Sequence, residues 1–284
     1  MRILVMGHKG MLGSDLMAVL GRDHEVSGVD VGEFDITSAA DCVRVVGEFR
    51  PGAVVNAAAY TDVDGCETNR ETCFAVNAEG VRNVAEACRA SAAKVVHYST
   101  DYVFDGTKGT PYVEDDPCRP ISAYGESKRR GEEHLVGTAG NHLLIRTAWL
   151  YGRQGKNFVK AILAKARDEK TLRVVDDQVG SPTFSLDLAQ ATKLLVELDC
   201  RGIFHVTNRG VCSWFQFARK ILEMAQVTGV SVEPIRSEEL NRKAKRPAYS
   251  VLSNGRFMEA TGRAMRPWQV ALNEYLTGQS HIHR

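Results

Sequence analysis

Short apolar runs alternate with longer amphipathic runs through the first half of the chain. The short runs are bounded by turn residues and predict buried strands at Arg2–Met6, Glu25–Val29, Ala53–Ala57, Lys94–Tyr98 and His142–Ile145. Apolar residues three and four positions apart predict helices at Met11–Leu20, Ala39–Glu48, Thr72–Ala90 and Ser122–Leu135. This alternation predicts an α/β fold with a doubly wound parallel Rossmann sheet, because a crossover helix returns each strand parallel to the last.

The pattern becomes less regular after about Gly152. Helices are predicted at Phe158–Ala166, Ser185–Leu198, Trp214–Ala225 and Pro267–Leu276, and strands at Leu172–Val175 and Gly202–Val206. We therefore expect a first domain over residues 1–152 and a smaller, mixed α/β C-terminal domain over residues 153–284. The segment at about 185–206 is expected to pack back on the first domain.

The composition is that of an ordinary globular protein, with 44% hydrophobic and 25% charged residues. The net charge of +1 favours neither nucleic acid nor an anionic membrane as a partner. No apolar run approaches the roughly 18 residues that a membrane helix needs. The chain begins without the apolar segment of a signal peptide.

The seven cysteines include no Cys-x-x-Cys pair. Their odd number and the lack of a secretion signal predict free thiols in a reducing cytoplasm. His281 and His283 are interpreted as part of a frayed tail rather than as metal ligands.

A glycine-rich turn follows the first predicted strand. Gly7, Gly10 and Gly13 are spaced Gly-x-x-Gly-x-x-Gly around Met11 and Leu12, where a helix is predicted to begin. Glycine reaches the positive φ of a tight turn without steric cost. The free N–H groups of a helix N-terminus attract an anion such as a pyrophosphate. The turn therefore predicts a dinucleotide site in residues 1–152, and a tight turn without a ligand is the alternative.

Asp30 closes the second predicted strand, where an acid accepts hydrogen bonds from the adenosine ribose of a dinucleotide. Its charge would repel the 2′-phosphate of NADP, so electrostatics alone favour NAD(H). Lys9, His8 or Arg22 could offset that preference if they lie close enough.

Two further segments border the predicted dinucleotide site. Asp35 and Ile36 stand where the chain enters the next helix. Either they contact the adenine ring, or the segment caps the helix through Asp35 or Thr37. Ala58, Ala59 and Tyr60 follow the strand Ala53–Ala57 at the edge where open α/β sheets bind ligands. The small side chains there let a cofactor lie against the backbone.

Tyr124 and Lys128 are four residues apart on the predicted helix Ser122–Leu135, so their side chains share one face. A phenol has a pKa near 10, and a neighbouring ammonium favours its ionised form. A phenol tuned in this way can give a proton to a carbonyl oxygen while hydride reaches the carbon. The spacing is common on helices, so its meaning depends on the glycine-rich turn.

Ser99, Thr100 and Asp101 directly follow the strand Lys94–Tyr98, at the same edge of the sheet. A hydroxyl of Ser99 or Thr100 could hydrogen-bond the substrate oxygen and tune Tyr124, and Asp101 could bind a sugar hydroxyl. An ordinary polar turn is the alternative. The basic cluster from Arg236 to Arg246 is interpreted either as a solvated helix face or as a contact for a phosphorylated ligand.

Together these residues resemble the extended short-chain dehydrogenase/reductase family, and within it the dTDP-4-dehydrorhamnose reductases. Besides the glycine-rich turn, the resembling stretches are Val55–Asp64, Val76–Gly80, Ser99–Gly106, Tyr124–Lys128 with Gly131 and Glu132, Arg146–Gly152, Asp176–Thr183, Arg246–Pro247 and Ser250–Asn254. The turn and Tyr-x-x-x-Lys are shared by the whole superfamily, whereas Ser-Thr-Asp-Tyr-Val-Phe, Arg-Thr-Ala-Trp and Asp-Gln-x-Gly-x-Pro-Thr are much more specific.

The resemblance implies a role for individual residues. Tyr124 resembles the family's proton donor, Lys128 its partner, and Thr100 the hydroxyl that tunes it. Thr100, Asp101 and Trp149 resemble the groups that hold a deoxysugar. An indole face also packs well on a pyranose ring, although a core tryptophan is the alternative for Trp149.

The activity that the resemblance implies is reduction of the C4 ketone of dTDP-4-dehydro-L-rhamnose to dTDP-L-rhamnose, with NADPH or NADH as cofactor. The alternatives are another nucleotide-sugar reductase or epimerase of this family, and a non-catalytic regulatory subunit similar to that of methionine adenosyltransferase. The intact Tyr124, Lys128 and Thr100 favour an enzyme.

Some family members bind Mg²⁺ between subunits through carboxylates, and Asp15 and Asp187 stand near the corresponding positions. Both occupy ordinary helix positions, so no metal is predicted. A homodimer is left open.

Overall fold

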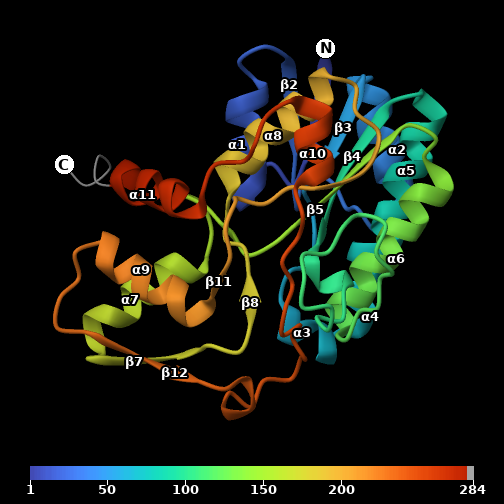
Figure 1. The fold of residues 1–284 in the computed structure, drawn as a ribbon. Helices are drawn as coiled ribbons and strands as arrows, with labels where there is room; N and C mark the ends of the chain where they lie inside the picture. Colours follow the sequence, from blue (N-terminus) through green and yellow to red (C-terminus); the bar gives the residue numbers. More distant parts are fainter. Residues whose placement is uncertain (280–284) are drawn as a thin grey trace.

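A six-stranded parallel sheet forms the centre of the computed structural model, which describes residues 1–279 (Figure 1). Its strands lie in the order β10-β5-β4-β3-β1-β2. Their bounds are β1 Arg2–Met6, β2 Glu25–Val29, β3 Ala53–Asn56, β4 Lys94–Thr100, β5 His142–Thr147 and β10 Gly202–His205. The order runs outward in both directions from the β1–β3 pair, so the predicted doubly wound Rossmann sheet is confirmed.

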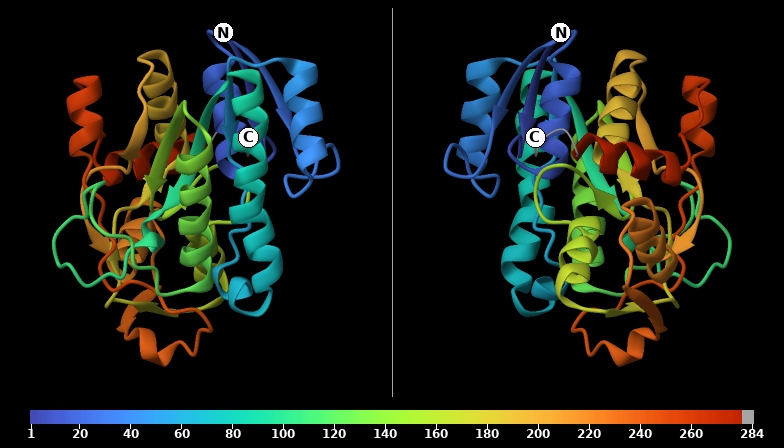
Figure 2. Two further views of the ribbon diagram at one scale, coloured as in Figure 1. Left: turned by 90° about the vertical axis from the view of Figure 1, so that its right-hand side faces the viewer. Right: turned by 90° about the vertical axis from the view of Figure 1, so that its left-hand side faces the viewer.

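Helices cover both faces of this sheet, and alternate strand residues point to each. Ile3 and Val5 of β1 pack with α1 (Met11–Leu20) and α8 (Ser185–Glu197). Leu4 and Met6 pack on the opposite face. The helices of that face are α2 (Ala39–Phe49), α5 (Gly80–Ser91) and α6 (Ala123–Thr138). Figure 2 shows these layers from two sides. Burial on both faces explains the nearly continuous apolar runs of the strands.

The helix predicted at Thr72–Ala90 is not continuous. Residues 63–91 form α3 (Val63–Thr68), α4 (Arg70–Phe74), a π-helical turn (Ala75–Glu79) and α5. Asn77 in the π-helical turn accepts the Tyr60 N–H at 2.8 Å and donates to the Tyr60 carbonyl at 3.0 Å. The π-helical turn is thus held by hydrogen bonds to Tyr60, in the segment that follows β3. Periodicity alone does not predict this contact.

The C-terminal region has a separate core of apolar side chains. Its elements are β6 Leu150–Tyr151, α7 Phe158–Asp168, β7 Thr171–Val175, β8 Val179–Gly180, β9 Thr183–Phe184, β11 Cys212–Ser213, α9 Trp214–Met224, β12 Ser231–Ile235 and α11 Trp268–Gln279. Helix α10 (Gly255–Thr261) instead packs beside β10, with Phe257 in the core of the first sheet. Strand β12 pairs with β7 alone and contains Pro234. Proline is tolerated in such an edge strand, but it hid this strand from the sequence analysis.

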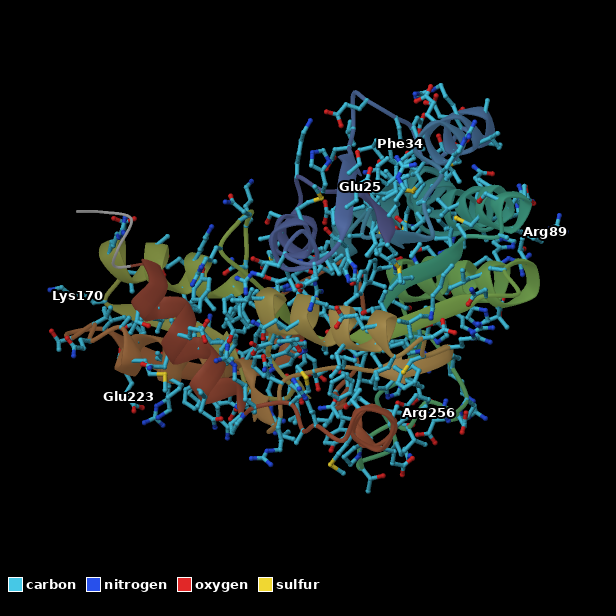
Figure 3. All side chains as sticks on the ribbon, turned by 90° about the horizontal axis from the view of Figure 1, so that it is seen from above. Glu25, Phe34, Arg89, Lys170, Glu223 and Arg256 are labelled. Carbon is cyan, nitrogen blue, oxygen red and sulfur yellow. The ribbon has the colours of Figure 1, made fainter. Side chains whose placement is uncertain are left out.

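The chain returns to the first sheet after β9. Helix α8 packs on α1, and β10 pairs in parallel with β5 to form the sheet edge. Seen from above in Figure 3, Glu25 of β2 and Phe34 lie on the other side of the molecule from Lys170 and Glu223.

No helix in residues 1–279 is both long and apolar enough to cross a membrane. His281 and His283 lie outside the described residues.

Candidate active site

The glycine-rich turn joins β1 to α1 and lies against the end of β3. Gly7 has a φ of +80°, and a Cβ there would lie 2.8 Å from Ala58 N. A Cβ at Gly13 would lie 2.0 Å from the Gly7 carbonyl oxygen. No side chain caps the N-terminus of α1 at Gly10. The turn therefore leaves free N–H groups beside an open space, as a bound pyrophosphate requires.

A cavity of about 550 Å³, here called the loop cavity, opens on one side of this turn. It is lined by Gly7, Gly10, Asp30, Val31, Gly32, Phe34, Asp35, Ile36, Ala57, Ala58, Ala59, Tyr60 and Val76. The sequence-predicted residues from four separate segments thus meet at one place. The cradle fits the adenosine half of a dinucleotide, which needs small residues near the phosphates and an open, partly apolar pocket.

Asp30 uses both of its carboxylate oxygens within the protein. Oδ2 accepts the Lys9 N–H at 2.7 Å, and Oδ1 accepts the Val31 N–H at 2.8 Å. The Lys9 ammonium lies 2.8 Å from Glu33 Oε1. Asp30 therefore orders the glycine-rich turn. Lys9, one of the cations that could offset the repulsion between Asp30 and a 2′-phosphate, lies beside it.

Asp35 is a turn residue as well as part of the cavity lining. Its Oδ1 accepts the N–H of Thr37 at 2.9 Å and the hydroxyl of Thr37 at 2.8 Å. Ser38 caps α2 by accepting the Asp41 N–H. The side chain that caps α2 is therefore Ser38, and not Asp35 or Thr37 as the sequence suggested.

A second cavity of about 410 Å³, here called the central cavity, shares Gly10 and Ala57–Ala59 with the loop cavity. The predicted Thr100, Asp101, Tyr124, Lys128 and Trp149 all line it. Its other lining residues are Met11, Leu12, Asn56, Thr61, Tyr98, Ser99, Thr147, Ala148, Leu150 and Lys156. The two cavities together follow the sheet edge from β2 to β5.

Tyr124 lies in the first turn of α6, which Ser122 caps by accepting the Gly125 N–H at 3.2 Å. A Cβ at Gly125 would lie 2.2 Å from the Tyr102 carbonyl, so glycine lets α6 approach the turn after β4. Burial raises the pKa of the Tyr124 phenol, and so does the Asp101 carboxylate. A hydrogen bond with Thr100 partly offsets that rise in pKa. The Tyr124 phenol is therefore neutral at pH 7.

Lys128 is 3% exposed, and its ammonium points into the sheet. Its Nζ donates to the Tyr98 carbonyl at 2.6 Å and lies 3.4 Å from His97 Nε2. Burial lowers the pKa of Lys128 to about 8. Within residues 1–279, Lys128 makes no hydrogen bond to the Tyr124 phenol, although both line the same cavity.

Strand β4 extends through Ser99 and Thr100, which the sequence analysis placed after the strand. Asp101 is 2% exposed, and burial raises its pKa to about 6. The hydroxyls of Ser99 and of Thr147 on neighbouring β5 are buried without a partner among the described residues. Such polar atoms are suited to a ligand's oxygen atoms. The sequence carried no signal that singled out Thr147.

Trp149 stacks on Trp214, with ring centroids 3.5 Å apart and planes 7° apart. Trp149 has a φ of +47°, a rare conformation for a large side chain. A Cβ at Gly180 would lie 2.5 Å from the Trp149 ring. One indole face is therefore already covered by Trp214, a residue that no motif in the sequence singles out.

A third cavity of about 550 Å³, here called the lower cavity, shares Lys156 with the central cavity. It is lined by Val63, Tyr102, Lys156, Asn157, Phe158, Ala161, Ile162, Lys165, Glu169, Leu172, Arg173, Val174, Val175, Gln178, Trp214, Leu240, Arg242 and Arg246. Arginine and lysine beside aromatic and aliphatic side chains suit a phosphorylated aromatic ligand.

The backbone of the basic cluster from Arg236 to Arg246 rules out one of its two interpretations, that of a solvated helix face. Residues 236–246 contain a short 3₁₀-helix at Ser237–Glu239 but no α-helix, so they form no solvated helix face. Arg246 binds both carboxylate oxygens of Asp64, at 2.9 and 3.2 Å. This pairing lowers the pKa of Asp64. Burial and the charge of Arg246 lower the pKa of Arg242.

Asp15 and Asp187 do not form a metal cluster in the described part of the chain. Asp187 pairs with Arg266 at 2.6 Å and accepts a hydrogen bond from Asn208 at 2.6 Å. Asp15 accepts a hydrogen bond from Ser185. No group of three or more His, Cys, Asp and Glu side chains in residues 1–279 could hold a metal ion.

Known proteins are similar to this chain in sequence and fold over nearly their whole length. A "dTDP-4-dehydrorhamnose reductase" of Streptomyces griseus is 41% identical over 96% of this chain and 92% of its own length. A "dTDP-4-keto-6-deoxy-D-glucose reductase" of Streptomyces niveus is 38% identical over 96% of each chain. The crystal structure of a dTDP-4-dehydrorhamnose reductase from Bacillus anthracis in complex with NADP has a TM-score of 0.94 and 36% identity. That match covers 98% of this chain and 99% of the other.

Residues 1–280 match the family described as "RmlD substrate binding domain". The resemblance seen in the motifs is thereby confirmed over nearly the whole sequence. The chain belongs to this family of nucleotide-sugar reductases.

Proposed function

We propose that this protein reduces the C4 ketone of dTDP-4-dehydro-L-rhamnose to dTDP-L-rhamnose, with NADPH or NADH as cofactor and Tyr124 as proton donor. The observation that carries the proposal is the single central cavity that Tyr124, Lys128 and Thr100 line beside the glycine-rich turn. The names and similarity of the relatives support the substrate class.

The dinucleotide would lie along the loop cavity and reach the central one. The turn Gly7, Gly10, Met11, Leu12 and Gly13 would hold its pyrophosphate against the α1 N-terminus. Asp30, Asp35, Ile36 and Ala58–Tyr60 would surround its adenosine. When bound, the reduced nicotinamide supplies the hydride.

Tyr124 would give its proton to the C4 oxygen. Its raised pKa keeps the phenol protonated at neutral pH, as a donor requires. Thr100 would hydrogen-bond the phenol and the same oxygen, and the Lys128 ammonium would favour the phenolate left after transfer. After proton transfer Tyr124 would be a phenolate, and it would regain a proton before the next turnover.

The substrate would extend from the central to the lower cavity. Asp101 and the unpartnered hydroxyls of Ser99 and Thr147 would bind the sugar, with Trp149 alongside. Lys156 and Arg242 would bind the diphosphate, because both are cationic and line the way into the lower cavity.

We also propose the corresponding division of labour along the chain. Residues 1–152 would bind the dinucleotide and, through Asp101 and Trp149, part of the sugar, and residues 153–284 would bind the rest of the sugar nucleotide, with residues 185–206 completing the first sheet. A homodimer and a cytoplasmic location stay predictions.

Tyr124→Phe tests the proton donor. We expect turnover to fall about 10²–10⁴-fold, because a positioned acid contributes that much, while NADPH binding is retained. The measurement is NADPH oxidation with the dTDP-ketosugar, together with NADPH binding by fluorescence. Tyr112→Phe, which removes a hydroxyl bonded to Asp105 instead, is the control.

The same assay separates the rival functions. Identification of the product by NMR distinguishes dTDP-L-rhamnose from another sugar, an alternative favoured by the Streptomyces niveus relative. Cofactor binding without turnover on any dTDP-ketosugar would favour the regulatory-subunit alternative. Turnover of Tyr124→Phe within a few-fold of the unmodified protein would show that another residue is the acid.

A further inference from the structure

The buried Lys128 ammonium depends on a histidine that the proposed mechanism does not use. An ammonium has three N–H donors. One is directed to the Tyr98 carbonyl at 2.6 Å, and a second faces His97 Nε2 at 3.4 Å. The third is left for the central cavity, where Lys128 would meet a ligand. His97 thus takes up a donor that would otherwise lie unpaired inside the protein.

His97 lies on β4 and is 1% exposed. Burial and the charge of Lys128 lower its pKa well below the usual value, so the imidazole is neutral. A neutral imidazole carries one N–H donor and one acceptor nitrogen, and the tautomer decides which is which. The partners on the two sides of the ring therefore determine where its single proton sits.

Asn56, at the end of β3, offers His97 both kinds of partner. Its side-chain nitrogen Nδ2 lies 3.2 Å from His97 Nδ1 and can donate to it. The side-chain oxygen of Asn56 is already used by the Ala58 N–H at 3.1 Å, which sets the orientation of the amide. A hydrogen bond with the Asn56 main chain acts to raise the pKa of His97, as expected where a carbonyl accepts from the imidazole N–H. Nδ1 can thus be bonded whether or not it carries the proton.

Each tautomer suits one charge state of Lys128. With the proton on Nδ1, bonded to the Asn56 carbonyl, Nε2 accepts from the Lys128 ammonium. With the proton on Nε2, Nδ1 accepts from the Asn56 amide and Nε2 donates to the lone pair of a neutral Lys128 amine. In passing from the first state to the second, the pair loses one proton in total. Both states give each ring nitrogen of His97 a partner, which matters because an unpaired buried group is costly. The Asn56 amide N–H is bonded to Nδ1 only in the second state.

We propose that His97 is the positioning residue of Lys128 and exchanges its tautomer when Lys128 loses its proton. The proposal rests on the proposed role of Lys128 in turnover. It gives a buried lysine two ordered states, so the lysine can release and regain a proton without leaving its place. The other groups that act on Lys128 are Glu132 on α6 and Cys73 on α4, which both favour its charged form. Tyr124 lies one turn earlier on α6.

Nuclear magnetic resonance of the unmodified, ligand-free protein tests the proposal directly. The ¹⁵N shifts of the His97 ring report its tautomer, and the ¹³Cε shift of Lys128 reports its charge, with Lys128→Arg used for assignment. We expect His97 to pass from the Nδ1–H to the Nε2–H tautomer with the same midpoint as Lys128, near pH 8. His205 is the control, because it is equally buried but contacts Arg146 and the Tyr112 carbonyl instead. A single His97 tautomer from pH 6 to 10, or formation of imidazolium there, would overturn the proposal.

Two variants extend the test. In His97→Leu the ammonium loses an acceptor, and we expect the Lys128 midpoint to fall by on the order of one pH unit. His97→Gln keeps an acceptor and should restore most of that shift. The basic limb of the kcat profile should move with the Lys128 midpoint. An unchanged midpoint in folded His97→Leu would contradict the proposal. The titrations need no substrate, so absence of turnover with the expected shifts would count against the proposed function alone.

Discussion

Asp101 places a carboxylate beside the Tyr124 phenol, inside the protein. Burial raises the pKa of Asp101 to about 6, and its charge helps to raise the pKa of Tyr124. The environment of each residue therefore favours its neutral form. Such unfavourable placement is common where a side chain serves a ligand rather than the fold.

Asp101→Asn should make the protein more stable at pH 8. The native state binds the Asp101 proton more tightly than the unfolded chain does, so stability is lost as pH rises from about 4 towards 6 and stays lost above it. Removing the charge should recover about 3 kcal/mol at pH 8 and progressively less below pH 6. Urea unfolding at pH 5 and pH 8 measures the difference.

Asp105→Asn is the matched control. The pKa of Asp105 is lowered, first by the Thr107 N–H, so its charged form is favoured in the native state. Neutralising Asp105 should give no gain at pH 8. The account of Asp101 fails if its asparagine variant is no more stable than the unmodified protein at pH 8.

Lys9 and Glu33 are expected to set the preference between the two cofactors. The Lys9 ammonium, beside Asp30, is held by Glu33 and would bind a 2′-phosphate once released. Glu33→Gln should raise the affinity for NADPH relative to NADH about fivefold, the scale of one exposed charge pair, and Lys9→Met should lower it. Fluorescence titration with both cofactors gives the ratio. Equal effects of either variant on NADPH and NADH would show that Lys9 does not reach the 2′-phosphate.

The elements around the site meet through unusually close backbone contacts. The glycine-rich turn touches the end of β3 at Gly7, and α6 touches the turn after β4 at Gly125. The π-helical turn Ala75–Glu79 carries Asn77 to the Tyr60 backbone. These contacts bring the carboxyl ends of β1, β3 and β4 to one edge, where the cavities form.

Gly13→Ala should abolish dinucleotide binding. Its Cβ would lie 2.0 Å from the Gly7 carbonyl oxygen, a backbone atom that cannot move away unless the turn deforms. We expect NADPH affinity to fall by at least about 100-fold, since near-contact backbone donors hold the pyrophosphate. Binding is measured by NADPH fluorescence.

Gly47→Ala provides the comparison for that variant. Gly47 lies in α2, and a Cβ there meets nothing within 4 Å. This change should leave binding unaltered and stabilise the helix by about 0.5–1 kcal/mol. Normal NADPH binding by Gly13→Ala would mean that the turn does not hold the cofactor.

The molecule as a whole is held together by a chain that leaves its first sheet and returns to it. Helix α8 covers α1, and β10 completes the edge next to β5. Buried polar contacts also join β10 to the first sheet. Arg146 on β5 forms an ion pair with Glu132 on α6 at 2.8 Å, and it contacts His205 on β10 at 3.3 Å. Residues 1–152 therefore contain most of the proposed cofactor site, whereas part of the packing behind that site comes from α8 and β10.

A fragment of residues 1–152 is expected not to fold by itself. Without α8, the apolar side chains of α1 that pack against it, such as Leu16 and Val19, would be exposed, and β5 would become an open edge. Circular dichroism should show no cooperative unfolding, in contrast to the full chain. Cooperative unfolding of the fragment with full NADPH binding would contradict this view of α8 and β10.

Periodicity and local backbone chemistry were enough to predict the parallel sheet, the glycine-rich turn and the Tyr124–Lys128 pair. These features depend on residues that are neighbours along the chain, where the strand period, the helix period and the freedom of glycine act directly. The break in the predicted helix Thr72–Ala90 was missed, because a π-helical turn is stabilised by Asn77 reaching another segment.

Contacts between distant segments were settled by packing alone. The stack of Trp149 on Trp214, the entry of Arg242 into the lower cavity and the chain from Asn56 through His97 to Lys128 each join separate elements. No local pattern encodes which side chains will share a buried space. That depends on how the helices and strands fill the interior together, where close packing allows few arrangements.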